Sequence, residues 1–283
     1  NELVIEAILE EAGRQDDLVL IEATANQVNQ YGGYTGMQAS DFVDYIYDIA
    51  QKVHFDKERI VLGGDHLGPL VWSGEPEEEA MEKAECLVRS FVKAGFSKIH
   101  LDTSMRLGSD SADCWPDTDK IAERGVRLYQ ACEEAYQALL QTDPQAVEPI
   151  YVIGSEVPIP GGGQEQKADI EVTSPADFEE TIRSYTKAFE KRGLTDAWNH
   201  IGAVVVQPGV EFSDSGVCSY DRVKAHELCL AVRQYPDLVM EGHSTDYQGA
   251  RLLREMARDG VGILKVGPAL TFSLREALFS LHK

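Results

Sequence analysis

Asp65 and His66 stand side by side in the segment GGDHLGP, residues 63–69, and combine a carboxylate with an imidazole. An imidazole binds divalent metal ions, and a carboxylate beside a metal-bound oxygen can accept or donate a proton. The flanking glycines let the backbone and a ligand approach each other closely. The pair therefore indicates a metal site with an acid–base group, whereas the alternative is a strand end whose two polar residues face water.

Other residues able to do chemistry close the remaining β-rich runs of the chain. A lone polar residue in this position usually belongs to a solvated turn, so the argument depends on all of them sharing one place in the fold. In chain order these residues are Glu22, Asp65 with His66, Asp102, Glu156, Gln207, His243 and Lys265.

Short apolar runs alternate with amphipathic segments along the sequence, which predicts a parallel sheet with helices packed on it. The helical segment 174–193 begins with the capping residue Ser174 followed by Pro175, as many helices do. The predicted strands are 17–24, 59–66, 98–104, 149–157, 201–209, 238–245 and 262–269. The predicted helices are 1–13, 39–53, 77–95, 119–140, 174–193, 220–235, 246–260 and 272–283.

This order of strands and helices fits a TIM (β/α)8 barrel that lacks one strand. Because the chain opens on a helix, we expect the first strand upstream of residue 1, and we expect residues 1–283 to form a single domain. An open, doubly wound sheet is the alternative, but no G-x-G-x-x-G follows the first predicted strand. In a barrel the carboxyl ends of all strands surround one pocket, so the polar residues that close the strands would meet there.

Two imidazoles and one or two carboxylates from this set suit a divalent metal ion, which we predict to be zinc. The predicted ligands are His66, Glu156 and His243, with Asp102 or Gln207 as a fourth. A position left open on the metal would then receive water or substrate.

Asp65 is the predicted acid–base group, and Asp102 and Glu22 are the other candidate catalytic residues. The remaining histidines lie in less informative places. His100 lies inside the run KIHLDTS and is predicted to be a half-buried strand residue, whereas His226 belongs to a helix and is predicted to lie on the surface.

The segments GHST and KVGPALT follow the last two predicted strands, where barrels often bind phosphate. Gly242, Ser244 and Gly267 are the candidate phosphate contacts there, and Lys265 would add a positive charge. Gln207 is a further candidate for substrate binding. No G-x-x-x-x-G-K-[ST] segment is present, so the sequence does not support a P-loop kinase mechanism.

Acidic residues outnumber basic ones by 48 to 26, which gives the 283-residue chain a net charge of −22. Such a surface repels nucleic-acid phosphates and anionic membranes, so neither is a predicted partner. The five cysteines are scattered without C-x-x-C spacing, which is typical of a reduced, cytoplasmic protein. No apolar stretch approaches the roughly 20 residues of a membrane helix, and no signal peptide is visible.

Seven long segments carry a resemblance to a known family. They are LIEATANQVNQYGGYTGM, GGDHLGP, AGFSKIHLDTSM, YVIGSEVPIPGG, VVVQPGVEF, GHSTDYQ and ILKVGPALTFSLREALF. In this order they closely resemble the non-catalytic subunit family of class II D-tagatose-1,6-bisphosphate aldolase, some members of which are labelled tagatose-6-phosphate kinase. The resemblance extends from Glu2 to the end of the chain.

The resemblance implies a TIM-barrel protein of galactitol and tagatose catabolism, similar to class II aldolases. It implies a phosphorylated ketohexose as ligand, a catalytic class II aldolase subunit as partner, and an oligomer. Family members are longer at both ends, with a strand before residue 1 and a helical extension after Lys283. The loops 106–119 and 161–170 also look unlike the usual family pattern.

The resemblance also bears on the site residues. Class II aldolases place an Asp–His pair like Asp65–His66 at a strand end, which makes His66 a metal ligand, and they use two further histidines on later strands. His243 fits one of these positions, whereas Gln207 stands where the other is expected. This departure puts aldolase turnover in doubt and leaves metal and sugar binding in place.

Three functions follow from these observations. The first is the accessory subunit of tagatose-1,6-bisphosphate aldolase, a lyase, with a retained pocket for metal and sugar phosphate. The second is a self-sufficient, metal-dependent 4-epimerase that interconverts tagatose 6-phosphate and fructose 6-phosphate. The third, tagatose-6-phosphate kinase, rests on the family label alone.

Overall fold

The computed structural model describes residues 1–155, 170–213 and 216–282 of the chain. The chain forms two compact units, each of which is described by itself below. The first comprises Asn1–Tyr151 and Ser184–His200, and the second comprises Val152–Arg183 and Ile201–Lys283. Among the described residues, no helix is both long enough and apolar enough to cross a membrane.

Seven strands among the described residues belong to one sheet, in the hydrogen-bonded order β1-β2-β3-β4-β5-β8-β9. The pairings of β1 with β2, β2 with β3, β5 with β8 and β8 with β9 are parallel, which confirms the predicted α/β class. The strands are β1 (Val19–Thr24), β2 (Ile60–Leu67), β3 (Lys98–Leu101), β4 (Ile150–Ile153), β5 (Ile201–Val206), β8 (Val239–Gly242) and β9 (Val261–Leu264).

Helices follow most of these strands, as the alternation of apolar and amphipathic segments predicts. The α-helices are α1 (Glu2–Gln15), α2 (Ala39–Lys52), α3 (Glu77–Lys93), α4 (Thr118–Leu140), α5 (Pro175–Lys191), α6 (His226–Val232), α7 (Ala250–Asp259) and α8 (Pro268–Leu281). Short 3-10 helices are η1 (Lys57–Arg59), η2 (Pro69–Trp72) and η3 (Ala197–His200).

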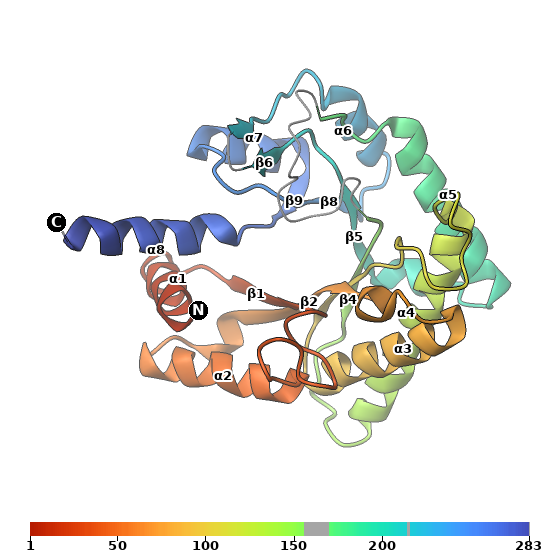
Figure 1. Cartoon of the computed structure of the whole chain (residues 1–283), viewed down its shortest axis with the longest axis horizontal. Coiled ribbons are helices and arrows are strands. Elements are labelled where there is room, and N and C mark those ends of the chain that lie inside the picture. The colour runs from red at the N-terminus through yellow and green to blue at the C-terminus, as the bar shows by residue number, and fades with distance from the viewer. Residues whose placement is uncertain (156–169, 214–215, 283) are drawn as a thin grey trace. The chain divides into compact units, whose positions relative to one another are not determined.

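In the first unit, α3 and α4 lie side by side (Figure 1). Leu87 and Phe91 of α3 and Val126 of α4 are fully buried, and ion pairs also link the two helices. The carboxylate of Asp117 caps α4 by accepting the N–H of Lys120 at 2.8 Å, which satisfies one of the free amides at the helix start. Burial of this apolar face fixes the helices and the loops that precede them.

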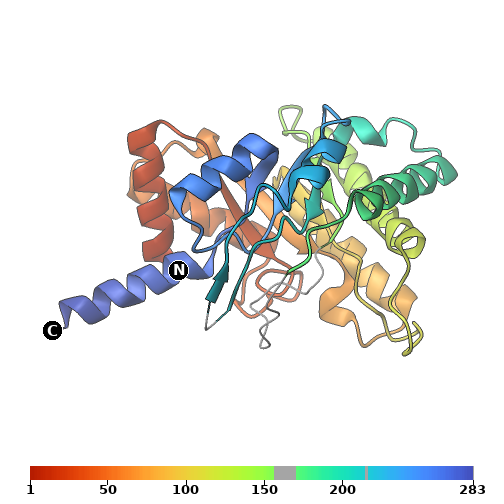
Figure 2. The same cartoon turned by 90° about the horizontal axis from the view of Figure 1, so that it is seen from above.

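In the second unit, β9 leads into α8, which is one straight helix drawn in blue at the C-terminal end (Figure 2). It begins at Pro268, four residues before the predicted start. The reason is a side-chain cap, since Asp246 Oδ1 accepts the N–H groups of Gly267 at 3.0 Å and Ala269 at 2.9 Å.

The structure differs from the predicted elements in two other places of the second unit. The predicted helix 220–235 is shorter and is reduced to α6. The segment after β5 forms an antiparallel ribbon of β6 (Glu211–Ser213) and β7 (Gly216–Cys218), which the sequence did not predict. Elsewhere in the chain, strands β3, β4, β5, β8 and β9 end earlier than predicted, so Asp102, Gln207, His243 and Lys265 lie just beyond the strands they follow.

Candidate metal centre

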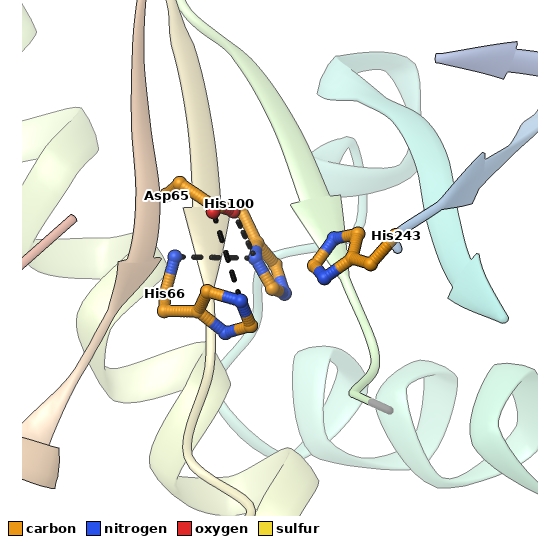
Figure 3. A group of neighbouring side chains, drawn as sticks. All are labelled: Asp65, His66, His100 and His243. Carbon is orange, nitrogen blue, oxygen red and sulfur yellow. Dashed lines mark hydrogen bonds and ion pairs between the residues drawn. The ribbon is translucent and has the colours of Figure 1, made fainter. Parts of the chain in front are cut away.

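Asp65, His66 and His100 form a close group in the first unit (Figure 3). Asp65 and His66 belong to β2, and His100 belongs to the neighbouring strand β3. Asp65 Oδ1 lies 3.0 Å from His100 Nδ1, and Asp65 Oδ2 lies 3.6 Å from His66 Nε2. Each residue offers one ligand atom, and these atoms lie within 4.8 Å of one another.

An irregularity of β2 explains how two consecutive residues contribute to one group. Successive side chains of a regular strand point to opposite faces of the sheet. Here the register of β2 against β3 shifts between Gly64 and Leu67, and His66 adopts a left-handed φ of 48°. Such a conformation is strained for a residue other than glycine, and strain of this kind is concentrated at functional sites.

Two glycines of the segment GGDHLGP permit close approaches around the site. A Cβ at Gly63 would lie 2.6 Å from Cγ of Glu22, and a Cβ at Gly68 would lie 1.7 Å from the carbonyl oxygen of Asp102. Any larger residue would therefore push β2 away from β1 or from the segment that follows β3. The glycines therefore serve packing between strands, besides the close approach of a ligand that the sequence suggested.

Asp102 holds His66 in one orientation. Its Oδ2 lies 3.0 Å from His66 Nδ1, and its Oδ1 accepts the N–H of Ser104 at 3.1 Å and the hydroxyl of the same residue at 2.7 Å. Burial raises the pKa of Asp102, but the hydrogen bond from His66 and the nearby imidazoles and serine outweigh it and lower this pKa to about 2.

An ionised Asp102 can only accept, so the proton of His66 resides on Nδ1, and Nε2, which lies 3.6 Å from Asp65 Oδ2, is the nitrogen that could bind a metal. This arrangement favours Asp102 as a group that orients His66, since a carboxylate with so low a pKa is a poor proton carrier at neutral pH. Its predicted catalytic role stays a prediction.

His100 and Asp65 are coupled through one proton position. His100 Nδ1 lies 3.2 Å from the backbone N–H of His66 and 3.0 Å from the carboxylate of Asp65. A single ring nitrogen cannot accept from the first and donate to the second at once, so the tautomer of His100 decides which of the two contacts is a hydrogen bond. A carboxylate in such a pair is suited to proton transfer.

Glu22 of β1 and Lys98 of β3 form a shielded ion pair on either side of Gly63 in β2. Glu22 Oε1 lies 2.7 Å from Lys98 Nζ, and the register places both beside Gly63, whose lack of a side chain leaves room between them. The sequence predicted Glu22 but not Lys98, which stands two residues before His100 on the same face of β3.

In the second unit, a buried carboxylate joins two of the predicted site residues. Glu241 is fully buried, and its Oε1 lies 2.8 Å from His243 Nε2 and 3.7 Å from Lys265 Nζ. As a carboxylate, Glu241 accepts from Nε2, so Nδ1 is the nitrogen of His243 that could bind a metal. The sequence reasoning missed Glu241, although it precedes His243 by two residues and so shares its face of the strand.

The candidate phosphate contacts differ in their position and in whether their N–H group already has a partner. Gly242 ends β8, and Ser244 is buried with a left-handed φ of 50°. The N–H of Gly267 already donates to Asp246, and a carboxylate at that helix start disfavours a phosphate in the same place. Glu156, the third predicted ligand, lies outside the described residues.

The donor set of the first unit fits a divalent ion. Two imidazoles and one carboxylate are a common set of zinc ligands. Metal-bound imidazoles usually donate a hydrogen bond to a carboxylate, and His66 has such a partner in Asp102. Asp65 is 7% exposed and His100 is fully buried, so the group is shielded from bulk water. The sequence predicted His66 as a ligand and placed His100 outside the site.

A family comparison decides what kind of protein carries this group. Residues 1–283 match the family described as D-tagatose-1,6-bisphosphate aldolase subunit GatZ/KbaZ-like. The chain belongs to this family. The GatZ/KbaZ-like assignment confirms the resemblance that the sequence segments indicate.

Relatives and solved structures agree with this assignment. The D-tagatose-1,6-bisphosphate aldolase subunit GatZ of Escherichia coli O1:K1 / APEC is 49% identical over 279 residues, which are 99% of this chain and 64% of that protein. The chain thus spans slightly less than two thirds of the length of the curated relatives it matches.

Two crystal structures are similar to this chain. A probable tagatose 6 phosphate kinase from Sinorhizobium meliloti 1021 superposes with a TM-score of 0.87 at 44% identity, over 99% of this chain and 66% of the other. A "putative fructose-1,6-biphosphate aldolase" from Coccidioides immitis has a TM-score of 0.52 at 16% identity, over 92% and 71% of the two chains, and shows similarity of fold alone.

Proposed function

We propose that this GatZ/KbaZ-like chain is the accessory subunit of a class II tagatose-1,6-bisphosphate aldolase in sugar catabolism, and that it retains a site for a divalent metal and a phosphorylated ketohexose. The observation that carries the proposal is the buried group of Asp65, His66 and His100 in a chain of this family. Buried carboxylates and imidazoles cost solvation free energy, and a bound cation compensates for this cost.

We propose zinc as the metal, and His243 remains a predicted ligand. Glu241 contacts the Nε2 of His243, so Nδ1 is the ring nitrogen that would bind the metal. Glu156 remains a predicted ligand.

Each residue of the first unit has a part in this site. A bound divalent ion would polarise a carbonyl or hydroxyl oxygen of the sugar. Asp65 would move a proton at that oxygen, with His100 Nδ1 as its neighbour at 3.0 Å. Asp102 would keep His66 in its binding tautomer, and the Glu22–Lys98 pair would fix the strands beneath it.

Metal content of the purified chain tests the site first. We expect about one zinc ion per chain by elemental analysis, and a large loss in His66→Ala. An unchanged metal content in His66→Ala, or a chain that takes up no divalent ion, would contradict the metal site.

Turnover assays test the role of the chain. We expect no cleavage of tagatose 1,6-bisphosphate by the chain alone, and a rise in activity or stability when it is added to a catalytic class II aldolase subunit. If the chain raised neither the activity nor the stability of any catalytic class II aldolase subunit, the accessory role would be contradicted.

A metal-dependent 4-epimerase is the second candidate, favoured by the Asp65–His100 contact, which supplies a proton-transfer pair without a partner subunit. Interconversion of tagatose 6-phosphate and fructose 6-phosphate by the chain alone, abolished by Asp65→Ala, would establish it. The kinase name of the Sinorhizobium meliloti protein leads to a third assay, which is ATP consumption with tagatose 6-phosphate.

Three further features of the whole protein are proposed with this function. The parallel strands alternating with helices, and the similarity of fold to the Coccidioides immitis protein, support a TIM (β/α)8 barrel. The five free cysteines support a reducing, cytoplasmic setting. Oligomer formation is expected from the family resemblance.

A further inference from the structure

Two hydrogen bonds to Thr173 hold the backbone of Gln207 at the carboxyl end of β5. Its N–H donates to the hydroxyl of Thr173 at 2.8 Å, and its carbonyl accepts the N–H of the same threonine at 2.9 Å. These reciprocal hydrogen bonds fix the residue between β5 and the segment before α5. The position of its Cβ is therefore well determined within the second unit.

The side-chain amide of Gln207 is held in one orientation. Its Oε1 accepts the N–H groups of Gly209 at 2.8 Å and Val210 at 3.0 Å. Only an oxygen can accept from these two amides, so the opposite end of the side chain must be the NH2 group. The turn after β5 thus presents a fixed donor.

That donor is buried and has no partner within the part of the chain that the structure describes. Gln207 is 3% exposed, and its Nε2 makes no hydrogen bond. Buried polar groups are satisfied in the great majority of cases, and an unsatisfied donor weakens the fold unless a ligand or water completes it. The buried Nε2 of Gln207 is therefore suited to donate a hydrogen bond to a bound ligand.

The neighbouring strand places Gln207 beside a candidate metal ligand. Val206 of β5 pairs with Gly242 of β8, so the next residues along the two parallel strands are Gln207 and His243. Partners in parallel strands direct their side chains to the same face of the sheet. Gln207 and His243 therefore follow the same end of these two neighbouring strands.

We propose that Gln207 is a sugar-binding residue whose Nε2 donates to a hydroxyl or carbonyl oxygen of the ketohexose, and that it is not a metal ligand. This inference rests on the proposed function. An amide nitrogen has no available lone pair for a metal, and the amide oxygen is already engaged by two backbone donors. A neutral donor also suits the sugar oxygens, since phosphates are more often bound by cationic side chains or helix starts.

The test compares Gln207→Glu with Gln248→Glu. Gln248 is a matched control because it is a buried amide of the same unit whose Oε1 accepts the N–H of Tyr220 at 3.1 Å and whose Nε2 donates to the carbonyl of Cys218 at 2.9 Å. Both substitutions keep the acceptor and replace the NH2 donor with oxygen.

Binding of neutral D-tagatose to the zinc-loaded chain is measured by calorimetry, so that repulsion between a new carboxylate and a phosphate does not contribute. We expect Gln207→Glu to weaken binding about tenfold or more, as loss of a buried hydrogen bond to a ligand commonly does. Its zinc content should match the wild type. Gln248→Glu should lower the melting temperature and leave the affinity unchanged, because its new oxygen faces a carbonyl.

Side-chain amide NMR gives a second measurement on the wild-type chain. D-tagatose should shift the NH2 resonances of Gln207 and leave those of Gln248 in place. Wild-type affinity in Gln207→Glu, or a lost zinc ion, would overturn the inference while the proposed function stands. A wild-type chain that binds neither D-tagatose nor D-tagatose 6-phosphate would instead overturn the proposed sugar site and the inference with it.

Discussion

At the scale of single residues, the sequence predicts which side chains do chemistry better than it predicts their partners. Asp65, His66 and His243 stand out because they follow apolar runs and lie beside glycines. His100 and Glu241 were missed because they lie inside strands, where a polar residue is usually structural. Spacing would have found both, since each stands two residues before a predicted site residue and so shares its face.

The substitution Asp102→Asn tests whether Asp102 orients His66 for metal binding. Asp102→Asn should lower zinc affinity by about 10- to 100-fold, the usual effect of losing the carboxylate partner of a metal-bound imidazole. Ser104 donates to one oxygen of Asp102 through its N–H and hydroxyl, so an asparagine would turn its NH2 toward His66. That donor favours the tautomer with the proton on Nε2, which cannot bind the metal. Competition with a zinc-binding dye measures the affinity.

Asp110→Asn is the control for this substitution. Asp110 is also a shielded, ion-paired aspartate of the first unit, but both its oxygens lie 2.8 Å from Nη2 of Arg124. The control should lose stability and keep its zinc affinity. Equal zinc affinity in Asp102→Asn and the wild type would show that His66 is oriented by other contacts.

At the scale of elements, the strands and helices follow from hydrophobic periodicity, whereas the irregularities do not. The shift in β2 and the left-handed φ of His66 depend on packing between neighbouring strands, which no local pattern of residues records. The cap that starts α8 at Pro268 likewise comes from Asp246, 22 positions earlier in the chain. Side-chain contacts over such distances explain why element ends are predicted less well than elements.

Gly63 of β2 lies between β1 and β3, and a substitution there tests how closely these strands pack. Gly63→Ala should destabilise the chain by about 1–3 kcal/mol, the usual cost of overpacking a core. The new Cβ would lie 2.6 Å from Cγ of Glu22, and the ion pair of Glu22 with Lys98 prevents that side chain from moving aside. Urea unfolding measures the effect.

Gly74→Ala is the matched control, because a Cβ there has no atom within 4 Å. It should change the free energy of unfolding by no more than about 0.5 kcal/mol. If both variants were equally stable, the close approach of Glu22 to β2 would not hold in solution.

The loop before α4 should make stability depend on pH through Asp110. Burial raises the pKa of this carboxyl, but hydrogen bonds from Lys120, the Leu107 amide and Arg124 outweigh it and lower the pKa from 3.8 to about 2. A depressed pKa stabilises the fold above the unfolded value and loses this effect as pH falls toward the folded one. The contribution near neutral pH is about 2 kcal/mol.

Comparison of the wild type with Asp110→Asn measures this contribution. The difference in their free energies of unfolding should be largest at pH 6, fall by about 1 kcal/mol at pH 3 and disappear toward pH 2. The exposed carboxylate of Asp113 in the same loop provides the control, Asp113→Asn. A difference that stays constant from pH 6 to pH 3 would contradict the assignment.

At the scale of the whole molecule, the α/β class and the family follow from the sequence, while the arrangement of the site needs the structure. Seven apolar runs predicted all seven strands of the parallel sheet, because continuous Val, Ile and Leu are required where a strand is covered on both faces. The ribbon of β6 and β7 was missed because its strands have only three residues each. A segment this short has no periodicity to detect.

Metal binding should stabilise the whole chain if the site has the proposed function. The carboxylates of Asp65 and Asp102 are 7% exposed each and lie on either side of His66, so a cation between the imidazoles relieves their mutual repulsion. Zinc at 100 times its dissociation constant would add about 2.7 kcal/mol, which is roughly 5 °C or more in Tm for a chain of this size. Differential scanning calorimetry with and without zinc measures this shift.

His66→Ala should abolish the shift, because it removes the imidazole that Asp102 orients, whereas His226→Ala should retain it. His226 is an exposed residue at the start of α6 and controls for the loss of a histidine in general. A chelator should return the wild type to the Tm of the metal-free chain. Stabilisation of both variants to the same extent would mean that zinc binds elsewhere on this acidic surface, since the 22 excess negative charges attract cations without a specific site.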